Sequence, residues 1–361
     1  MSSIFGKLFS VSTWGESHGR AVGAVVDGCP AGLPLSEEDV QRAMDRRRPG
    51  QNALVTPRKE ADTVHILSGV FDGKTTGTPI SLLVQNENQH SGDYSEMENR
   101  YRPGHADLTY DLKYGFRDFR GGGRASARET LARVAAGAIA GKILKLACET
   151  EILSWVESVG NVSAEIDAEK VTLEAVEASP VRCPDVYASE KMAQVVREAI
   201  ASKDSVGAVL ALDIRKLPVA LGEPVFDKLQ SVLGAALLSI PAVKGFEIGE
   251  GFRAAQMHGS EHNDEIFFDG KDFRTRSNHA GGVLGGISNG ETIHCRLAFK
   301  PTATIAQEQK TAGRDRTNGT LAARGRHDPC VALRAPVIVE SMAALALVNL
   351  FLEQRARSGL F

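Results

Sequence analysis

The residues best suited to chemistry lie in the run from Arg117 to Glu129, which reads R-D-F-R-G-G-G-R-A-S-A-R-E. Three consecutive glycines allow the backbone to turn tightly and to approach a ligand closely, because no Cβ is in the way. Ser126 is a good N-cap and Glu129 has the spacing of a capping box, so we expect a helix to begin near Ala127. The run therefore predicts a glycine turn followed at once by a helix.

A helix that begins there would direct its free backbone N–H groups and the positive end of its dipole at the glycine turn. The arginines that flank this turn are Arg120, Arg124 and Arg128. The pattern is typical of an anion site, and phosphate is the anion we expect. The run is neither a Walker A motif nor a dinucleotide G-x-G-x-x-G, so the carrier of the phosphate stays open. A simple turn with solvated arginines is the alternative.

Two histidines lie in polar, glycine-flanked settings. The motif G-E-S-H-G at 15–19 places Ser17 and His18 at the tip of a predicted hairpin, where packing gives little reason for polar groups. His105 follows a Pro-Gly pair and is close to Asp107. Because imidazole titrates near working pH, either ring can serve as a general acid or base. An exposed turn histidine is the alternative for His18.

A second cluster of cations ends the helix that Ser36 is expected to cap. Arg46, Arg47 and Arg48 stand together before Pro49. Cations at a helix C-terminus are favourable to the dipole, which accounts for one or two of them. Three in a row exceed that need, so the cluster predicts a second contact to phosphate or carboxylate.

The elements that must position these groups follow from hydrophobic periodicity and turn residues. The order of elements is similar in the two halves and indicates a loose internal duplication. We therefore expect an α+β fold with antiparallel sheets packed around central helices, and a binding loop or lid in the long polar segment 85–120. The predicted strands are 7–13, 21–27, 63–71, 78–86, 151–159, 206–215, 243–252 and 293–299, and the main predicted helices are 37–45, 131–147, 189–200, 225–240 and 339–353.

Composition narrows the class of protein. The chain has 361 residues, of which 42% are hydrophobic and 24% charged, as in an ordinary soluble protein. A net charge of -3 argues against a general nucleic-acid binder. We expect no membrane span, no secretory signal and a cytoplasmic location. Five cysteines without a C-x-x-C pair indicate neither a disulfide framework nor a metal site, and Cys330 is either a packed thiol or a nucleophile.

Taken together, the motifs resemble the chorismate synthase family over nearly the whole chain. In order they are G-E-S-H-G, V-D-G-C-P-A-G, D-R-R-R-P-G, S-G-V-F-D-G-K-T-T-G-T-P-I, R-P-G-H-A-D, G-G-G-R-A-S-A-R-E, L-G-E-P-V-F-D-K-L, S-N-H-A-G-G-V-L-G-G-I-S and G-R-H-D-P-C. The resemblance implies one domain over residues 1–361, with sheets around a helical layer and a homotetrameric assembly.

The resemblance also implies an activity. Members convert 5-enolpyruvylshikimate 3-phosphate to chorismate and phosphate in the shikimate pathway, by an anti 1,4-elimination that requires reduced FMN without net redox change. A substrate with one phosphate and two carboxylates, together with a flavin phosphate, accounts for the many arginines. NADPH would act only indirectly, through an external flavin reductase. No nucleic acid or membrane partner is implied.

Residue roles are carried over from the family onto matching positions. His18 would be the acid near the leaving phosphate, and His105 would hold or supply a proton at the flavin ring. Asp328, with Ser17, would relay the substrate's proton through the flavin. Contacts to FMN would come from Arg124, Ala125, Ser126, Pro241, Ala242, Gly285, Lys300, Pro301, Thr302, Ala303, Thr304 and Arg326. Contacts to substrate or NADP would come from Arg46, Arg47, Arg48 and Arg128.

One position departs from the family pattern. Many bacterial members carry an arginine where this chain has Ala53, which counts against a defined NADP site.

Two other classes of function remain to be weighed. A protein that binds RNA or polyphosphate would use the arginine clusters but not the His and Asp loops, and a scaffold without activity would not need all the candidate catalytic groups.

Overall fold

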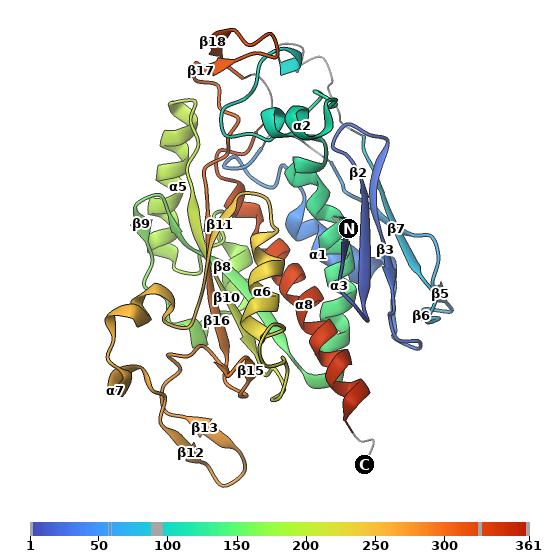
Figure 1. The fold of residues 1–361 in the computed structure, drawn as a ribbon, viewed down its shortest axis with the longest axis vertical. Helices are drawn as coiled ribbons and strands as arrows, with labels where there is room; N and C mark the ends of the chain where they lie inside the picture. Colours follow the sequence, from blue (N-terminus) through green and yellow to red (C-terminus); the bar gives the residue numbers. More distant parts are fainter. Residues whose placement is uncertain (1–2, 57, 59, 88–96, 324–326, 359–361) are drawn as a thin grey trace.

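The structure is a computed structural model that describes residues 3–56, 58, 60–87, 97–323 and 327–358. Two five-stranded antiparallel sheets enclose a layer of helices (Figure 1). The first sheet has the order β1-β2-β3-β7-β4, with bounds Ile4–Phe5, Ser10–Gly15, Ala21–Asp27, Ile80–Gln85 and Val64–Ile66. The second has the order β11-β16-β10-β8-β9, with bounds Val243–Ile248, Ile293–Phe299, Ala208–Arg215, Glu151–Val159 and Val162–Ser163. The predicted β-α-β sandwich is confirmed.

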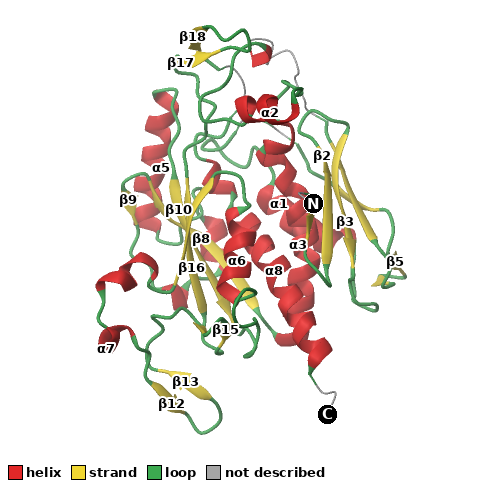
Figure 2. Ribbon diagram, in the orientation of Figure 1, coloured by secondary structure: helices red, strands yellow, loops and turns green. Residues whose placement is uncertain are grey.

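The helices between the sheets are α1 (Glu37–Arg47), α3 (Thr130–Cys148), α6 (Leu229–Leu238) and α8 (Pro336–Arg357). Helix α3 packs on β2, β3 and β7 of the first sheet, and α8 packs on β8 and β10 of the second. Helices α3 and α8 also pack on each other (Figure 2). Each half thus contributes one sheet and its helices, which agrees with the duplication indicated by the sequence.

Close approach of α3 and α8 depends on small residues. A Cβ added to Gly137 of α3 would lie 2.4 Å from the Cβ of Ser341 on α8. Glycine in α3 therefore lowers helix propensity but lets the two helix backbones come together.

Helix α8 is long and apolar enough to cross a membrane by length and composition alone. The structure gives the physical reason for its apolar circumference, because 78% of the membrane-length window is buried inside this one chain. Such burial is typical of the core helix of a globular protein.

Several boundaries differ from the predictions. The segment 85–120 contains helix α2 (Asp107–Tyr114), and the 63–71 and 78–86 pair is β4 with β7, separated by the small hairpin β5 (Val70–Phe71) and β6 (Lys74–Thr75). Helix α6 begins at Leu229 rather than 225. The remaining helices are α4 (Leu173–Ala178), α5 (Val186–Ala201) and α7 (Gly259–His262). Three further hairpins pair β12 (Ile266–Phe268) with β13 (Phe273–Thr275), β14 (Val283–Leu284) with β15 (Ile287–Ser288), and β17 (Gln309–Ala312) with β18 (Asn318–Leu321).

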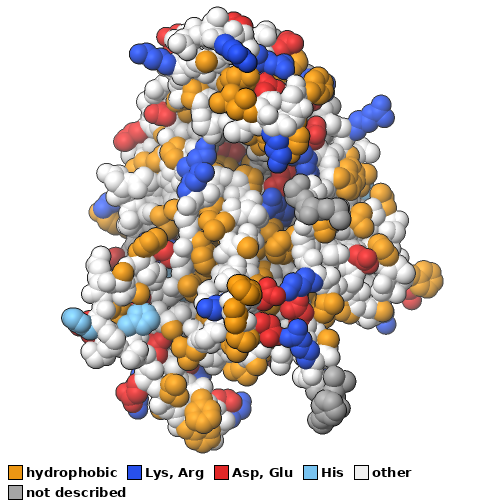
Figure 3. All heavy atoms as spheres, viewed as in Figure 1, with side chains coloured by type: hydrophobic (Ala, Val, Ile, Leu, Met, Phe, Trp, Pro, Cys, Tyr) orange, Lys and Arg blue, Asp and Glu red, His pale blue; other side chains and the backbone are white. Residues whose placement is uncertain are grey.

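The face drawn in Figure 3 mixes basic and acidic side chains with hydrophobic ones and shows no continuous basic surface. Hydrophobic side chains gather at the lower tip, where the β12–β13 hairpin lies and where Ile266, Phe268 and Phe273 are exposed. On this face, the charges do not form the electrostatic footprint of a nucleic-acid binder.

Candidate active site

A cavity of about 470 Å³ lies where loops from both halves meet. It is lined by the turn after β2, the glycine turn before α3, the segment before α2 and the segments after α6 and β16. Most of the site residues predicted from the sequence line this one cavity, although they are scattered over more than 300 residues of chain. They are Ser17, His18, Arg47, His105, Arg124, Ala125, Ser126, Arg128, Pro241, Ala242, Lys300, Pro301, Thr302, Ala303, Thr304 and Asp328.

His18 is buried at the tip of the β2–β3 hairpin. Its Nδ1 lies 3.1 Å from Ser17 Oγ, and a Cβ added to Gly121 of the glycine turn would lie 2.4 Å from the ring. Burial, together with the positive charge of Arg58, lowers the pKa of His18 to about 4. The imidazole is therefore neutral near pH 7 when no ligand is bound.

His105 is held from behind by a carboxylate. Its Nδ1 lies 2.9 Å from Asp107 Oδ1, and Asp107 accepts three hydrogen bonds from Arg102. Burial lowers the pKa of His105, while the hydrogen bond to Asp107 opposes that change. Sequence analysis noted the motif but did not foresee that Arg102 lines the cavity.

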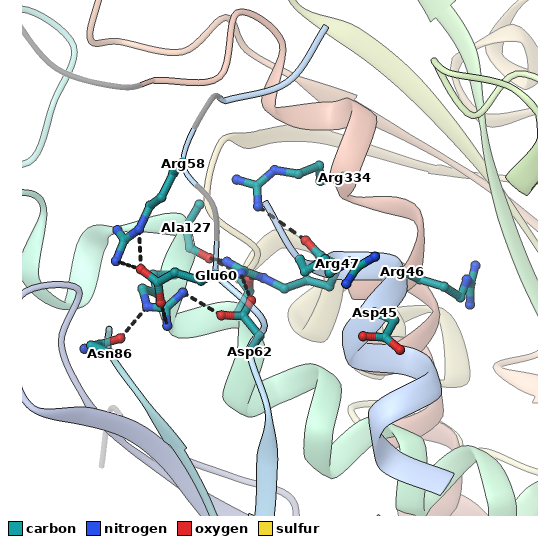
Figure 4. A network of polar contacts seen from close by, with 12 residues as sticks. Asp45, Arg46, Arg47, Arg58, Glu60, Asp62, Asn86, Ala127 and Arg334 are labelled. Atoms are coloured by element: carbon teal, nitrogen blue, oxygen red, sulfur yellow. Dashed lines mark hydrogen bonds and ion pairs between the residues drawn. The ribbon is translucent and has the colours of Figure 1, made fainter. Parts of the chain in front are cut away.

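Arginines and carboxylates form a network at one wall of the cavity (Figure 4). Asp62 accepts from Arg47 Nη1 at 3.1 Å and from Arg128 Nη1 at 2.8 Å, and Glu60 pairs with both Arg58 and Arg128. Arg47 also donates to the carbonyl of Ala127, at the start of the turn before α3. Burial, reinforced by Arg334, lowers the pKa of Arg47 to about 10.

Two cations of the cavity have only uncharged partners among the described residues. Arg124 donates to Thr13 Oγ1 at 2.7 Å and to the Gly15 carbonyl at 3.0 Å. Lys300 Nζ donates to the Gly104 carbonyl at 3.0 Å. Their positive charges are therefore open to an anionic ligand, in contrast to the paired arginines.

Asp328 is linked to Arg47 through Arg334, whose Nη1 donates to the Arg47 carbonyl at 3.3 Å. Its Oδ1 accepts from the Thr56 N–H at 2.9 Å and from Arg334 Nε at 3.1 Å, and its Oδ2 accepts from Arg334 Nη2. Arg334 was not among the site residues predicted from the sequence. The signal available was a lone arginine inside the otherwise apolar run V-A-L-R-A-P, six residues after Asp328.

Some predicted residues lie outside the cavity. Arg46 points away from Arg47 in Figure 4 and pairs with Glu177 and Glu340. Arg48 is exposed after the end of α1, and Gly285 is exposed at the tip of the β14–β15 hairpin. Arg326 lies outside the described residues.

Arg120, which was expected to flank the anion site, also lies outside the cavity, where it is exposed and pairs with Asp118. The buried Cys330 is a packed thiol, since burial raises its pKa to about 12 and so suppresses the thiolate.

The predicted capping box is wrong. Ser126 caps a short 3-10 turn, Ala127–Glu129, by accepting from the N–H of Arg128, and α3 starts only at Thr130. Glu129 instead pairs with Arg133. An anion at the glycine turn would therefore meet the side chains around the turn rather than the N-terminus of an α-helix that begins at Ala127.

A second chamber of about 730 Å³ adjoins the first, and the two share His105, Arg124 and part of the glycine turn. Its wall is partly apolar and aromatic, with Tyr110, Tyr114, Phe116, Met342 and Leu345. The two chambers together offer a cationic part for anionic groups and an apolar part for a flat ring system.

Comparison with known proteins places the chain among one set of enzymes. The sequence profile described as chorismate synthase matches residues 9–352. Proteins named chorismate synthase from Synechocystis sp. and from Opitutus terrae are each 54% identical, over 99% and 100% of this chain and 99% of their own lengths. A solved structure titled "Crystal Structure of Chorismate Synthase" aligns with a TM-score of 0.74 and 32% identity, and covers 97% of this chain and 93% of the other.

Proposed function

The chain belongs to the chorismate synthase family, whose members are lyases of the shikimate pathway, and on that premise we propose that it eliminates phosphate from 5-enolpyruvylshikimate 3-phosphate to give chorismate. The observation that carries this proposal is the cavity that gathers His18, His105 and Asp328 with the unpaired cations Arg124 and Lys300. A substrate with a phosphate and two carboxylates needs such cationic donors, and the elimination needs groups that transfer protons.

His18 would protonate the departing phosphate. The ring is neutral without ligand, because its pKa is lowered to about 4 by burial and Arg58. A phosphate dianion beside the ring favours the imidazolium, so the substrate itself would raise the pKa of His18 and load the proton. Ser17 Oγ, 3.1 Å from Nδ1, would hold the ring during this change.

Asp328 would accept a proton at its carboxylate. Arg334 and the Thr56 N–H fix its orientation, and each carboxylate oxygen offers two lone pairs, so hydrogen bonding to Arg334 does not exhaust its capacity to accept. The same contacts hold the carboxylate in one orientation at the cavity wall before the substrate arrives.

The residues present fit reduced FMN. Arg124 and Lys300 would bind the flavin phosphate, since their charges are not paired with carboxylates of the described residues. The neighbouring wall that would hold the rest of the cofactor consists of Ala125, Ser126, Pro241, Ala242, Pro301, Thr302, Ala303 and Thr304. When bound, the reduced flavin supplies an electron-rich ring that can lend and recover an electron.

We further propose, from the family resemblance, a homotetramer in the cytoplasm that receives reduced FMN from an external reductase. NADPH would then act only through that reductase. Arg47, the position that the family assigns to NADP or substrate, is buried against Asp62, and Ala53 is exposed and carries no charge. Anaerobic turnover with NADPH, catalytic FMN and no reductase, at the rate seen with dithionite, would contradict this part.

The decisive experiment mixes the purified protein anaerobically with dithionite-reduced FMN and 5-enolpyruvylshikimate 3-phosphate, and follows chorismate absorbance with phosphate release. We expect equal amounts of both products, and none when FMN is omitted or left oxidised. A folded protein that binds FMN but yields no product would refute the proposed function.

A further inference from the structure

The carboxylate of Asp107 connects His105 to the rest of the fold. Its Oδ1 lies 2.9 Å from His105 Nδ1, and the Asp107 side chain is only 4% exposed. Although burial opposes ionisation, the hydrogen bonds from Arg102 and His105 hold the pKa of Asp107 well below its usual range. An ionised carboxylate can only accept hydrogen bonds, so the proton of the neutral His105 ring must be on Nδ1.

Arg102 in turn fixes the carboxylate. Its backbone N–H and its Nε donate to Asp107 Oδ2 at 3.1 and 2.8 Å, and its Nη2 donates to Oδ1 at 2.7 Å. The same Nη2 donates to the carbonyl of Gly121 at 2.7 Å. Gly121 is the residue whose Cα faces the His18 ring, so one guanidinium is linked to the surroundings of both histidines.

We propose that Asp107, oriented by Arg102, is a positioning residue that keeps His105 in the tautomer with hydrogen on Nδ1 and leaves Nε2 for the cavity. Its significance for turnover rests on the proposed function. Asp107 lines the adjoining chamber and not the cavity that holds His18 and Asp328. Its carboxylate is only 4% exposed and is already bonded to Arg102 and His105, so we expect it to act through His105. A carboxylate behind an imidazole is a general means of fixing ring orientation and tautomer.

The substitution Asp107→Asn makes a sharp test because the hydrogen-bond pattern predicts which way the amide will lie. Two donors of Arg102 meet at the Oδ2 position and only one, Nη2, at the Oδ1 position, so the amide oxygen of asparagine should take the Oδ2 place, where it keeps more of these hydrogen bonds. The NH2 group then takes the Oδ1 position and donates to His105 Nδ1. The variant should therefore transfer the ring proton to Nε2.

The tautomer is read by NMR of the protein labelled with ¹⁵N-histidine, which separates protonated from unprotonated ring nitrogens and needs neither FMN nor substrate. We expect a protonated Nδ1 for His105 in the wild type and an unprotonated Nδ1 in Asp107→Asn. In the enzyme assay we expect kcat to fall by about 10- to 100-fold with KM little changed, as for other residues that orient a functional imidazole.

Asp111→Asn is the matched control. Asp111 lies one turn further on α2, its side chain is 7% exposed, and it pairs with Arg117 and Arg314 rather than with His105. We expect Asp111→Asn to leave the ¹⁵N signals of His105 and kcat unchanged. It should show how much stability is lost when any buried carboxylate on α2 is neutralised.

A second variant covers the case in which Asp107→Asn does not fold. Arg102→Lys preserves the charges of the cluster but cannot bond both carboxylate oxygens and the Gly121 carbonyl together. We expect it to show signals of both His105 tautomers. If His105 keeps its proton on Nδ1 in every folded variant, the inference is wrong whether or not the protein makes chorismate. If the His105 tautomer changes as expected but neither the wild type nor any variant makes chorismate, the inference about Asp107 holds and only the proposed function fails.

Discussion

Replacement of Gly121 by alanine should show how turnover depends on the position of His18, apart from any effect of the substitution on the free energy of unfolding. Gly121 has φ of +72°, and an added Cβ would lie 2.4 Å from both Cε1 and Nδ1 of His18 and 2.8 Å from Ser17 Oγ. The atoms that must move belong to side chains and not to backbone. The protein should therefore accommodate the methyl group by displacing the imidazole.

The magnitude follows from two contributions. Left-handed backbone costs a non-glycine residue about 1–2 kcal/mol, which lowers the free energy of unfolding. Ordinary contact begins at 3.4 Å, so the ring must shift by about 1 Å, and a displacement of that size can lower a rate by about 100-fold. The loss in transition-state stabilisation would be about 2.7 kcal/mol.

Gly115→Ala supplies the control. Gly115 has nearly the same φ, +69°, but no atom within 4 Å of the added Cβ. Urea denaturation should show a similar loss of stability in both variants, whereas steady-state turnover with reduced FMN should fall only in Gly121→Ala. Equal activity in the two variants would show that the position of His18 against the glycine turn has no part in catalysis.

Three further outcomes are expected. His18→Ala, His105→Ala and Asp328→Ala should each lower turnover strongly with little change in melting temperature or FMN binding, and wild-type turnover in any of them would remove that residue from the mechanism. Arg124→Ala should weaken FMN binding by about 10- to 100-fold, because a hydrogen bond to a charged group contributes about 1.5–3 kcal/mol, and unchanged binding in a fluorescence titration would place the flavin phosphate elsewhere. The pKa of His18 is lowered to about 4, and an anion beside the ring would raise that pKa, so substrate binding near neutral pH should take up protons. Calorimetry in buffers of different ionisation enthalpy would detect this proton uptake. An absence of uptake would argue against His18 as the acid.

Local signals predicted most of the fold. Strand β8 has the predicted bounds, because alternating apolar residues between turn residues define it within its own segment. Helix α2 was missed because Asp107–Tyr114 is short and partly polar, and its position depends on Arg102 and Arg117, which bond to its carboxylates. Such contacts cannot be inferred from periodicity.

Most residues of the predicted site line one cavity, but their hydrogen-bond and ion-pair partners were not predicted. Arg47 and Arg128 were expected to contact a ligand, and both line the cavity. Each is also bound to Asp62, which lies 15 residues from Arg47 and 66 residues from Arg128 in the sequence. Arg46, next to Arg47, faces Glu340 on the other side of α1, since adjacent residues of a helix point in different directions. A run of arginines alone gives no indication of this division.

The pairing of these cations determines how the cavity can accommodate its ligands. Arg47, Arg58 and Arg128 share Glu60 and Asp62, so that cluster keeps one net positive charge. Arg124 and Lys300 add two, while the three remaining arginines that line the cavity have carboxylate partners: Arg102 with Asp107, Arg133 with Glu129 and Arg334 with Asp328.

Three positive charges from the described residues are fewer than the negative charges of the proposed ligands. A phosphate carries about -1.5 to -2 near neutral pH, so the substrate, with its two carboxylates, brings about -3.5 to -4 before the flavin phosphate is counted. Three imidazoles line the cavity, those of His18, His105 and His327, and an imidazole is the side chain that becomes cationic most readily once such charge arrives. The deficit of fixed positive charge therefore favours protonation of His18 and His105 on ligand binding, which would prepare an acid only when there is a phosphate to expel.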